Sequence, residues 1–329
     1  MIIHKFFFLF RRIHHIFWNN ISSFGIGITW FKILNELSPH ITNSRITNYI
    51  YENKHKQILK YIEKKYRKDI EIIIKEISTL IPQQPEEFCI WQCWWQGAEK
   101  LKDITKLCTQ SVKINCNEIP IKFITFENYE NFITLPYAIL EKHKKGIISL
   151  TELSDILRMN LLWKRGGLWI DTTILVNQTI DKEIELATFY TCPEECKDKR
   201  FVSEYKWNTS IIGGKQNLHL FAFVSKMFER YWEKENKLID YYLLDYFIAL
   251  GYKYVPAIKK EIDNIPHNNP QKHNLQFFLN TPYKEKIWKE LTNRTYIFKL
   301  SRKSSEPYVK YTRKKELTFY GYLYQKYNI

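Results

Sequence analysis

The sequence predicts an α/β protein, a sheet with helices on both faces, preceded by a mainly helical N-terminal region. Between residues 86 and 250, short apolar runs of strand length alternate with helical patterns, which is typical of βαβ units. Between residues 45 and 80, apolar residues recur at helical spacing, as at Ile70, Ile73 and Ile77. The length of 329 residues and the apolar content of 45% allow a sizeable core.

Each element follows from its own pattern. Helices are expected at 45–80, 100–116, 137–144, 150–164, 218–235 and 238–250, and strands at 88–95, 121–126, 168–170, 187–191 and 210–213. The run IPQQP at 81–85 is typical of a helix end followed by a linker. We therefore expect a basic helical extension at 1–85, an α/β domain at 86–300 and a basic tail at 301–329.

The best-defined unit is a capped helix followed by a buried strand. Ser149 and Glu152 form a capping box at the start of the helix. Two glycines at 166–167 end it, and the apolar strand 168–170 delivers Asp171 at its carboxyl end. Ligands of open α/β sheets bind beyond the carboxyl ends of the strands. Asp171 is therefore a candidate site residue.

Two further charged residues precede this strand. Asp155 and Arg158 are three apart on the capped helix and share one face. An ordinary surface ion pair would explain them equally well. A carboxylate such as Asp171 can hold a divalent cation that neutralises a diphosphate, and an arginine can pair with phosphate or a sugar hydroxyl. The unbroken order of helix, turn, strand and acidic residue favours such a site.

These residues also carry a family resemblance. SDILR at 154–158 and GGLWIDTT at 166–173 resemble the donor-site signature of glycosyltransferases with a DxD-containing sugar-binding region. That group includes the yeast-type initiating mannosyltransferases and, more distantly, the large clostridial glucosylating toxins. IWQCWWQG at 90–97, GIIS at 146–149, and YW at 231–232 running on to LIDY at 238–241 resemble the bacterial capsular polysaccharide synthesis family in particular. The likeness covers roughly residues 86–300.

The resemblance implies a GT-A-like domain, a nucleotide-sugar donor, expected to be a UDP-sugar, and retention at the anomeric carbon. By that likeness Asp155 and Arg158 would hold the sugar and phosphates of the donor, and Asp171 would bind metal or ribose. Gln92 and Trp95 would lie near the nucleotide base, although core packing is an equally ordinary role for Trp91, Trp94 or Trp95. These assignments are expectations of the resemblance.

The same family resemblance makes three more residues candidates for the site. Asp240 and Asp245 are expected on the helix 238–250, with a catalytic or acceptor-side role, although a charge near a helix start explains Asp240 as well. Asn208 would touch donor or acceptor. None of the three forms a motif by itself.

One departure from the family pattern concerns the metal. A full DxD would place a second carboxylate at 173, where this chain has Thr173. Mn²⁺ or Mg²⁺ would then need a further ligand beside Asp171, for which His273 is the first candidate and His267 the second. A basic group such as Lys272 could instead stabilise a diphosphate without metal.

We therefore expect a glycosyltransferase that moves a hexose onto a growing capsular or other surface polysaccharide. The acceptor is expected to be a lipid-linked glycan. The alternative is a catalytically degenerate transferase fold that serves as a scaffold or binding module in polysaccharide assembly. A basic protein that binds nucleic acid or acidic polymer through its ends ranks behind both, because it leaves the residues around Asp171 unexplained and the sequence holds no nucleic-acid motif.

The net charge of +15 lies at the two ends of the chain. Residues 1–80 carry 13 basic and 6 acidic residues, 281–329 carry 12 and 4, and 81–280 carry 25 of each. Basic ends suit an anionic membrane surface, but they also serve solubility. Residues 2–34 mix aromatic residues with Lys5, Arg11, Arg12 and Lys32, which is typical of an interfacial helix or of a helix packed on the domain.

The expected location is cytoplasmic, peripheral at the inner face of the cell membrane, because no apolar run reaches about 18 residues and no export signal is evident. Reduced thiols are expected in that compartment. The C-x3-C spacings disfavour a zinc site. The cysteines lie at 89, 93, 108, 116, 192 and 196.

Overall fold

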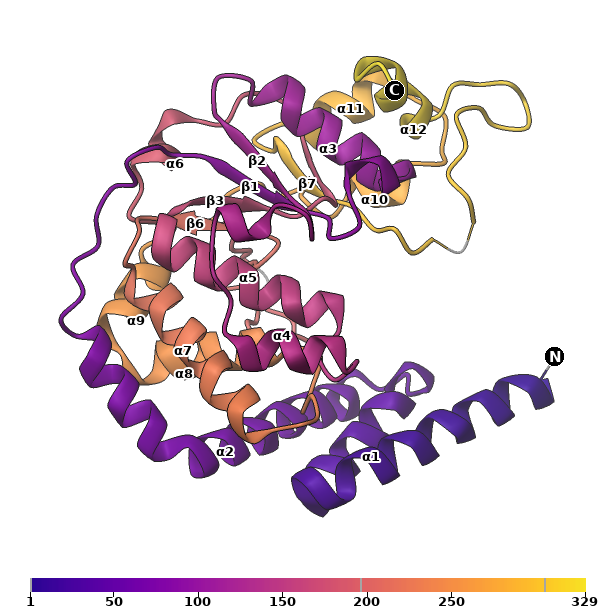
Figure 1. Ribbon diagram of the computed structural model, residues 1–329. Coiled ribbons are helices and arrows are strands. Elements are labelled where there is room, and N and C mark those ends of the chain that lie inside the picture. Colours follow the sequence, from indigo (N-terminus) through magenta and orange to yellow (C-terminus); the bar gives the residue numbers. More distant parts are fainter. Residues whose placement is uncertain (1, 196, 305) are drawn as a thin grey trace.

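The computed structural model describes residues 2–195, 197–304 and 306–329 (Figure 1), and of residues 2–6 and 8 it describes the backbone alone. Cys196 and the side chain of Lys5 therefore lie outside the described part. The remainder confirms the predicted fold class: a mixed α/β sheet with helices on both faces and a helical N-terminal region. No helix in the described ranges combines the length and apolar character needed to cross a membrane.

The central sheet has five strands in the order β2-β1-β3-β6-β5. Its strands are β1 (Ile90–Cys93), β2 (Ile121–Ile124), β3 (Gly167–Ile170), β5 (Phe189–Thr191) and β6 (Ile211–Gly214). β1 pairs in parallel with β2 and β3, whereas β6 runs antiparallel to β3 and β5. The carboxyl ends of β1 and β3 therefore meet at one edge of the sheet.

Side chains of β3 alternate between two cores, as a pleated strand requires. Leu168 and Ile170 pack with Val112 of α3 (Asp103–Asn115), and Trp169 packs with α5 (Leu150–Arg165) and α7 (His219–Lys234). Figure 1 shows α3 on one side of the sheet and α4 (Tyr137–Lys144), α5 and α7 on the other. Both faces of the strand that precedes Asp171 are thus buried.

The predicted start of α5 and its connection to β3 are confirmed. The Ser149 side chain accepts from the Glu152 amide, and the Glu152 carboxylate accepts from the Ser149 amide. Gly167 has a φ of 94°, and a Cβ there would lie 2.6 Å from the carbonyl oxygen of Cys89. Only glycine lets β3 begin this close to the start of β1.

The N-terminal region is a pair of long helices, α1 (Ile2–Leu37) and α2 (Ser44–Ile77), joined by η1 (Ser38–His40). Gly25 interrupts α1 and Tyr66 interrupts α2 with non-helical backbone angles. Apolar side chains of α2, among them Ile58 and Ile62, are fully buried in the same core as α5 and α7. Figure 1 shows the pair lying along the helical side of the domain.

The helix expected at 238–250 was misplaced. α8 spans Leu243–Tyr254, so Asp240 lies before the helix and not on it. The pattern misled because Leu238 and Ile239 continue the apolar spacing of the helix. In the structure they belong to the loop before α8, where the buried Ile239 packs in the main core.

The structure also contains elements that the sequence analysis did not predict, most of them in the last part of the chain. β4 (Ile174–Val176) pairs antiparallel with β7 (Ile297–Lys299) in a separate two-stranded sheet. The accompanying short helices are α6 (Lys182–Leu186), α9 (Pro256–Asp263), α10 (Leu275–Phe278), α11 (Glu285–Thr292) and α12 (Phe319–Lys326), with 3-10 turns η2 (Ala98–Lys100) and η3 (Tyr129–Asn131). Phe298 and Phe319 belong to a third apolar cluster, so the tail from 301 onward packs on the domain.

Candidate functional site

A hollow of about 490 Å³ lies over the carboxyl ends of β1 and β3. Asp171 comes directly after β3, and Trp94 comes directly after β1. The other walls come from one face of α5, from Tyr241 before α8 and from the chain that follows β7. Its charged lining residues are Asp155, Arg158, Asp171, Lys299, Arg302 and Lys303. This is the position in which an open α/β sheet binds its ligand.

Asp171 is held by three donors. The guanidinium of Arg158 donates to Oδ1 at 3.0 Å and the indole of Trp169 donates to the same oxygen at 2.8 Å. The ammonium of Lys299 donates to Oδ2 at 3.0 Å. Burial alone would raise the pKa of Asp171, but the charges of Lys299 and Arg158 hold that pKa below its ordinary value. The carboxylate is therefore ionised and fixed in direction.

Arg158 joins the two predicted carboxylates. Its other terminal nitrogen lies 3.1 Å from Asp155 Oδ1, and its guanidinium lies 4.9 Å from the centre of the Trp169 ring. The arginine is only 5% exposed. Burial raises the pKa of Asp155 to about 7, against the opposing effect of the Arg158 charge. The structure thus brings Asp155, Arg158 and Asp171 together, as the sequence predicts, in an environment unlike a surface ion pair.

Lys299 is a site residue that the sequence analysis missed. It ends β7, where it pairs in register with Ile174 of β4. Its ammonium also donates to the hydroxyl of Thr173 at 2.7 Å. No local pattern marks this lysine, because its partners lie well over a hundred residues earlier in the chain.

The tryptophans after β1 have different roles. Trp95 is buried, donates from its indole to Ser154 Oγ at 2.8 Å, and packs against Phe126. Trp94 is half-buried and lines the hollow, with the guanidinium of Arg302 4.9 Å from its ring centre. Trp94 is therefore better placed than Trp95 for stacking on a ligand. Gln92 is fully buried on β1, and its amide has no hydrogen-bond partner among the described residues.

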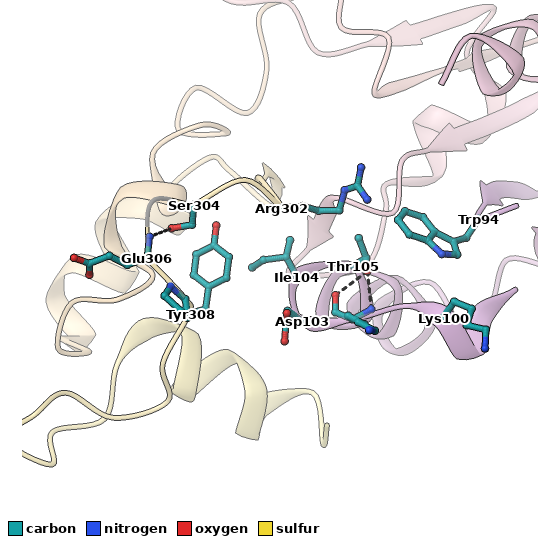
Figure 2. A pocket seen from close by; sticks show the side chains of 11 residues that line it. Trp94, Lys100, Asp103, Ile104, Thr105, Arg302, Ser304, Glu306 and Tyr308 are labelled. Atoms are coloured by element: carbon teal, nitrogen blue, oxygen red, sulfur yellow. Dashed lines mark hydrogen bonds between the residues drawn. The ribbon is translucent and has the colours of Figure 1, made fainter. Parts of the chain in front are cut away.

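A second hollow of about 440 Å³ adjoins the first. Trp94 and Arg302 line both. Figure 2 shows Trp94 and Lys100 on one side of this second hollow and Glu306 and Tyr308 on the other. The two hollows together give the site room for more than one ligand group.

The remaining predicted residues lie around the site rather than in it. Asp240 faces away, with its carboxylate 3.7 Å from the ammonium of Lys54 on α2. Asp245 accepts from the indole of Trp207 at 2.8 Å, and burial raises its pKa to about 6. Asn208 accepts from the Ser210 amide. None of the predicted residues in this group lines the hollow.

The residues gathered here do not fit a metal site built from carboxylates. Both oxygens of Asp171 already accept from cations, and Thr173 is occupied by Lys299. The His273 ring lies 3.1 Å from the Glu194 carboxylate. Both His273 and His267 lie outside the hollow. Over the described ranges, no three His, Cys, Asp or Glu side chains group in a way that could hold a metal ion. The expected Mn²⁺ or Mg²⁺ stays a prediction without a ligand set.

The fold and site define an α/β protein whose sheet edge presents one fixed carboxylate among several cations, which suits a ligand that carries both hydroxyls and negative charge. The chain belongs to the capsular polysaccharide synthesis protein family, whose match spans residues 38–323. This confirms the family predicted from sequence and extends it through α2. The narrower likeness to DxD glycosyltransferases stays a prediction.

Solved structures that match include a chain described as "PaToxG Glycosyltransferase", at 14% identity and a TM-score of 0.35. The match covers 76% of this chain and 96% of that chain. The chain matches no curated protein.

Proposed function

We propose that the protein is a glycosyltransferase that moves a hexose from a nucleoside-diphosphate sugar, expected to be a UDP-sugar, onto a growing capsular or other surface polysaccharide. The observation that carries the proposal is the ionised Asp171 at the carboxyl end of β3, fixed between Arg158 and Lys299 in a hollow. Membership of the capsular polysaccharide synthesis family supports it.

The lining residues suggest how such a donor would lie. Arg158 reaches the hollow with a buried, fixed guanidinium, which suits phosphate or sugar hydroxyl groups. Asp155 and Asp171 provide oxygens that accept sugar or ribose hydroxyls. Trp94 offers the aromatic face on which a base would stack, with Arg302 beside it.

Catalysis would rest on positioning and on charge neutralisation of the leaving diphosphate. We propose transfer with retention, by a displacement on one face of the sugar that the leaving diphosphate steers. The second hollow, reached past Trp94 and Arg302, would leave room for the glycan acceptor, expected to be lipid-linked.

The test is thermal unfolding against a panel of nucleotide sugars, followed by donor turnover with the ones that bind. A donor present at a hundredfold excess over its Kd raises stability by about 2.7 kcal/mol. Asp171→Asn should lose this shift, whereas Asp263→Asn, on the far helix α9, should keep it. If no donor shifts the wild type, the transferase proposal fails and the scaffold alternative, favoured by Thr173, takes its place.

We further propose that α1 attaches the protein to an anionic membrane surface. Phe7, Phe10, Phe17 and Trp18 recur on one helical face and are exposed by 61%, 66%, 38% and 60%. Arg11 is exposed beside them. Aromatic side chains next to a basic residue suit the interface between headgroups and acyl chains.

Vesicle flotation tests this attachment. Phe10→Ser combined with Trp18→Ser should release the protein from vesicles that contain anionic lipid. Phe277→Ser, which removes an aromatic ring that is 75% exposed on α10, should not. Wild-type protein that stays unbound at low salt would refute the attachment.

A further inference from the structure

We infer that Lys299 supplies the fixed positive charge that neutralises the donor diphosphate, so that donor binding needs no added divalent metal. The inference rests on the proposed function and specifies how its site handles charge. It starts from the juxtaposition of one ammonium with Asp171 and Thr173.

The ammonium of Lys299 lies between the two positions that a D-x-D pair would occupy. It is 3.0 Å from Asp171 Oδ2 and 2.7 Å from Thr173 Oγ1. A cation held by side chains at 171 and 173 would compete for the same place. A lysine ammonium has three donors, and two are used here. The side chain lines the hollow and is 26% exposed, which leaves the third donor available to a ligand.

The backbone holds this lysine in place. The Leu300 amide donates to the Thr173 carbonyl at 2.9 Å, and the Lys299 amide donates to the Lys272 carbonyl at 2.7 Å. These two backbone hydrogen bonds attach the end of β7, where Lys299 lies, on both sides. A charge fixed in this way needs little rearrangement when the ligand arrives, which is the condition for effective electrostatic stabilisation.

The net charge of the side chains that line the hollow also favours diphosphate binding without metal. Four cationic side chains line it, Arg158, Lys299, Arg302 and Lys303, against the carboxylates Asp155 and Asp171. With the carboxylates ionised, the net is 4 − 2 = +2 from side chains alone. Such a site attracts a diphosphate and repels a divalent cation. Thr173 then fits its position, because a second carboxylate there would cancel part of the charge that the diphosphate needs.

The experiment measures binding of the diphosphates of uridine, guanosine, adenosine, cytidine and thymidine by calorimetry. Each is tested with EDTA and again with Mn²⁺. We expect one of them to bind with the same Kd in both conditions. Lys299→Gln should weaken that binding by about tenfold or more, since a charge-assisted hydrogen bond is lost. Lys299→Arg should bind within a few-fold of wild type, and Lys289→Gln, which changes an exposed side chain of α11, should bind as wild type does.

The outcomes separate this inference from the proposed function. Binding that requires Mn²⁺ overturns the inference and leaves the transferase standing. If the Kd is the same with EDTA as with Mn²⁺, and the same for Lys299→Gln as for wild type, the proposed role of this lysine is overturned. No binding of any nucleoside diphosphate in either condition overturns the proposed function and the inference together. Should Lys299→Gln fail to fold, the comparison of EDTA with Mn²⁺ on the wild type still decides the question of metal.

Discussion

The ammonium of Lys54 on α2 lies 3.7 Å from the carboxylate of Asp240, and both side chains are buried. The next residue along the chain, Tyr241, lines the hollow. From α1, Lys32 donates to the carbonyl of Ile239 at 2.6 Å. The N-terminal helices therefore support one wall of the site from behind. Composition left open whether the N-terminal helix lies on a membrane surface or packs on the domain, and it assigned residues 1–85 no role in the site.

We predict that this ion pair stabilises the fold. Either Lys54→Met or Asp240→Asn leaves a buried group without its partner, and each should lower the free energy of unfolding by about 3 kcal/mol. The double variant should lose less than the sum of the two. Urea denaturation of the four proteins measures the coupling. Additive losses would show that the pair is not coupled.

The same variants address the catalytic role that the sequence assigned to Asp240. If this aspartate only supports the wall, the folded double variant and the folded Lys54→Met variant should turn over donor at similar rates. A loss of turnover confined to the proteins that carry Asp240→Asn would restore the catalytic assignment.

Arg158 should matter for both stability and binding. Arg158→Met leaves Asp155 and Asp171 close together without the charge between them, so we expect a loss of about 3 kcal/mol in the free energy of unfolding and no donor binding. Adding Asp155→Asn removes one of the two repelling charges and should recover part of the stability but none of the binding. Chemical denaturation and calorimetry measure the two effects separately. Recovery of binding in the double variant would contradict the assigned role.

Much of the fold was predictable because its signals are local. The capping box at Ser149, the two glycines at 166–167 and the buried strand before Asp171 each follow from a few adjacent residues. The pairing of Asp155 with Arg158 follows from helical spacing alone. These elements deliver half of the site.

The rest depends on contacts between distant segments. Lys299 reaches Asp171 only because β7 pairs with β4, and no local pattern in either strand specifies the other. Trp94 and Trp95 are adjacent and chemically alike, so the sequence does not show which of the two rings is buried in the core. In the structure both residues border the hollow, but Trp95 is buried against Phe126 and donates to Ser154, whereas Trp94 is half-buried.

The turn before β3 should tolerate no side chain. A Cβ on Gly167 would lie 2.6 Å from the Cys89 carbonyl oxygen, a backbone atom that cannot move aside without shifting β1. Gly167→Ala should therefore cost about 3 kcal/mol or more of stability. Gly146→Ala is the matched control, because Gly146 also has a positive φ, of 72°, but a Cβ there meets nothing within 4 Å. It should cost only about 1 kcal/mol. Equal thermal shifts for the two variants would contradict the steric argument.

Asp245 should make stability depend on pH. Burial raises its pKa to about 6 from an ordinary value of 3.8, so the folded protein holds this proton more tightly than the unfolded chain. Between about pH 4 and pH 6 the folded state binds more protons, and the free energy of unfolding must fall as pH rises through that window. Asp245→Asn keeps an oxygen that accepts from the Trp207 indole but carries no charge. The variant should therefore be close to the wild type near pH 4 and exceed it by roughly 2–3 kcal/mol at pH 7.5. Thermal unfolding across this range measures the difference, and parallel pH profiles for the two proteins would show that Asp245 titrates normally.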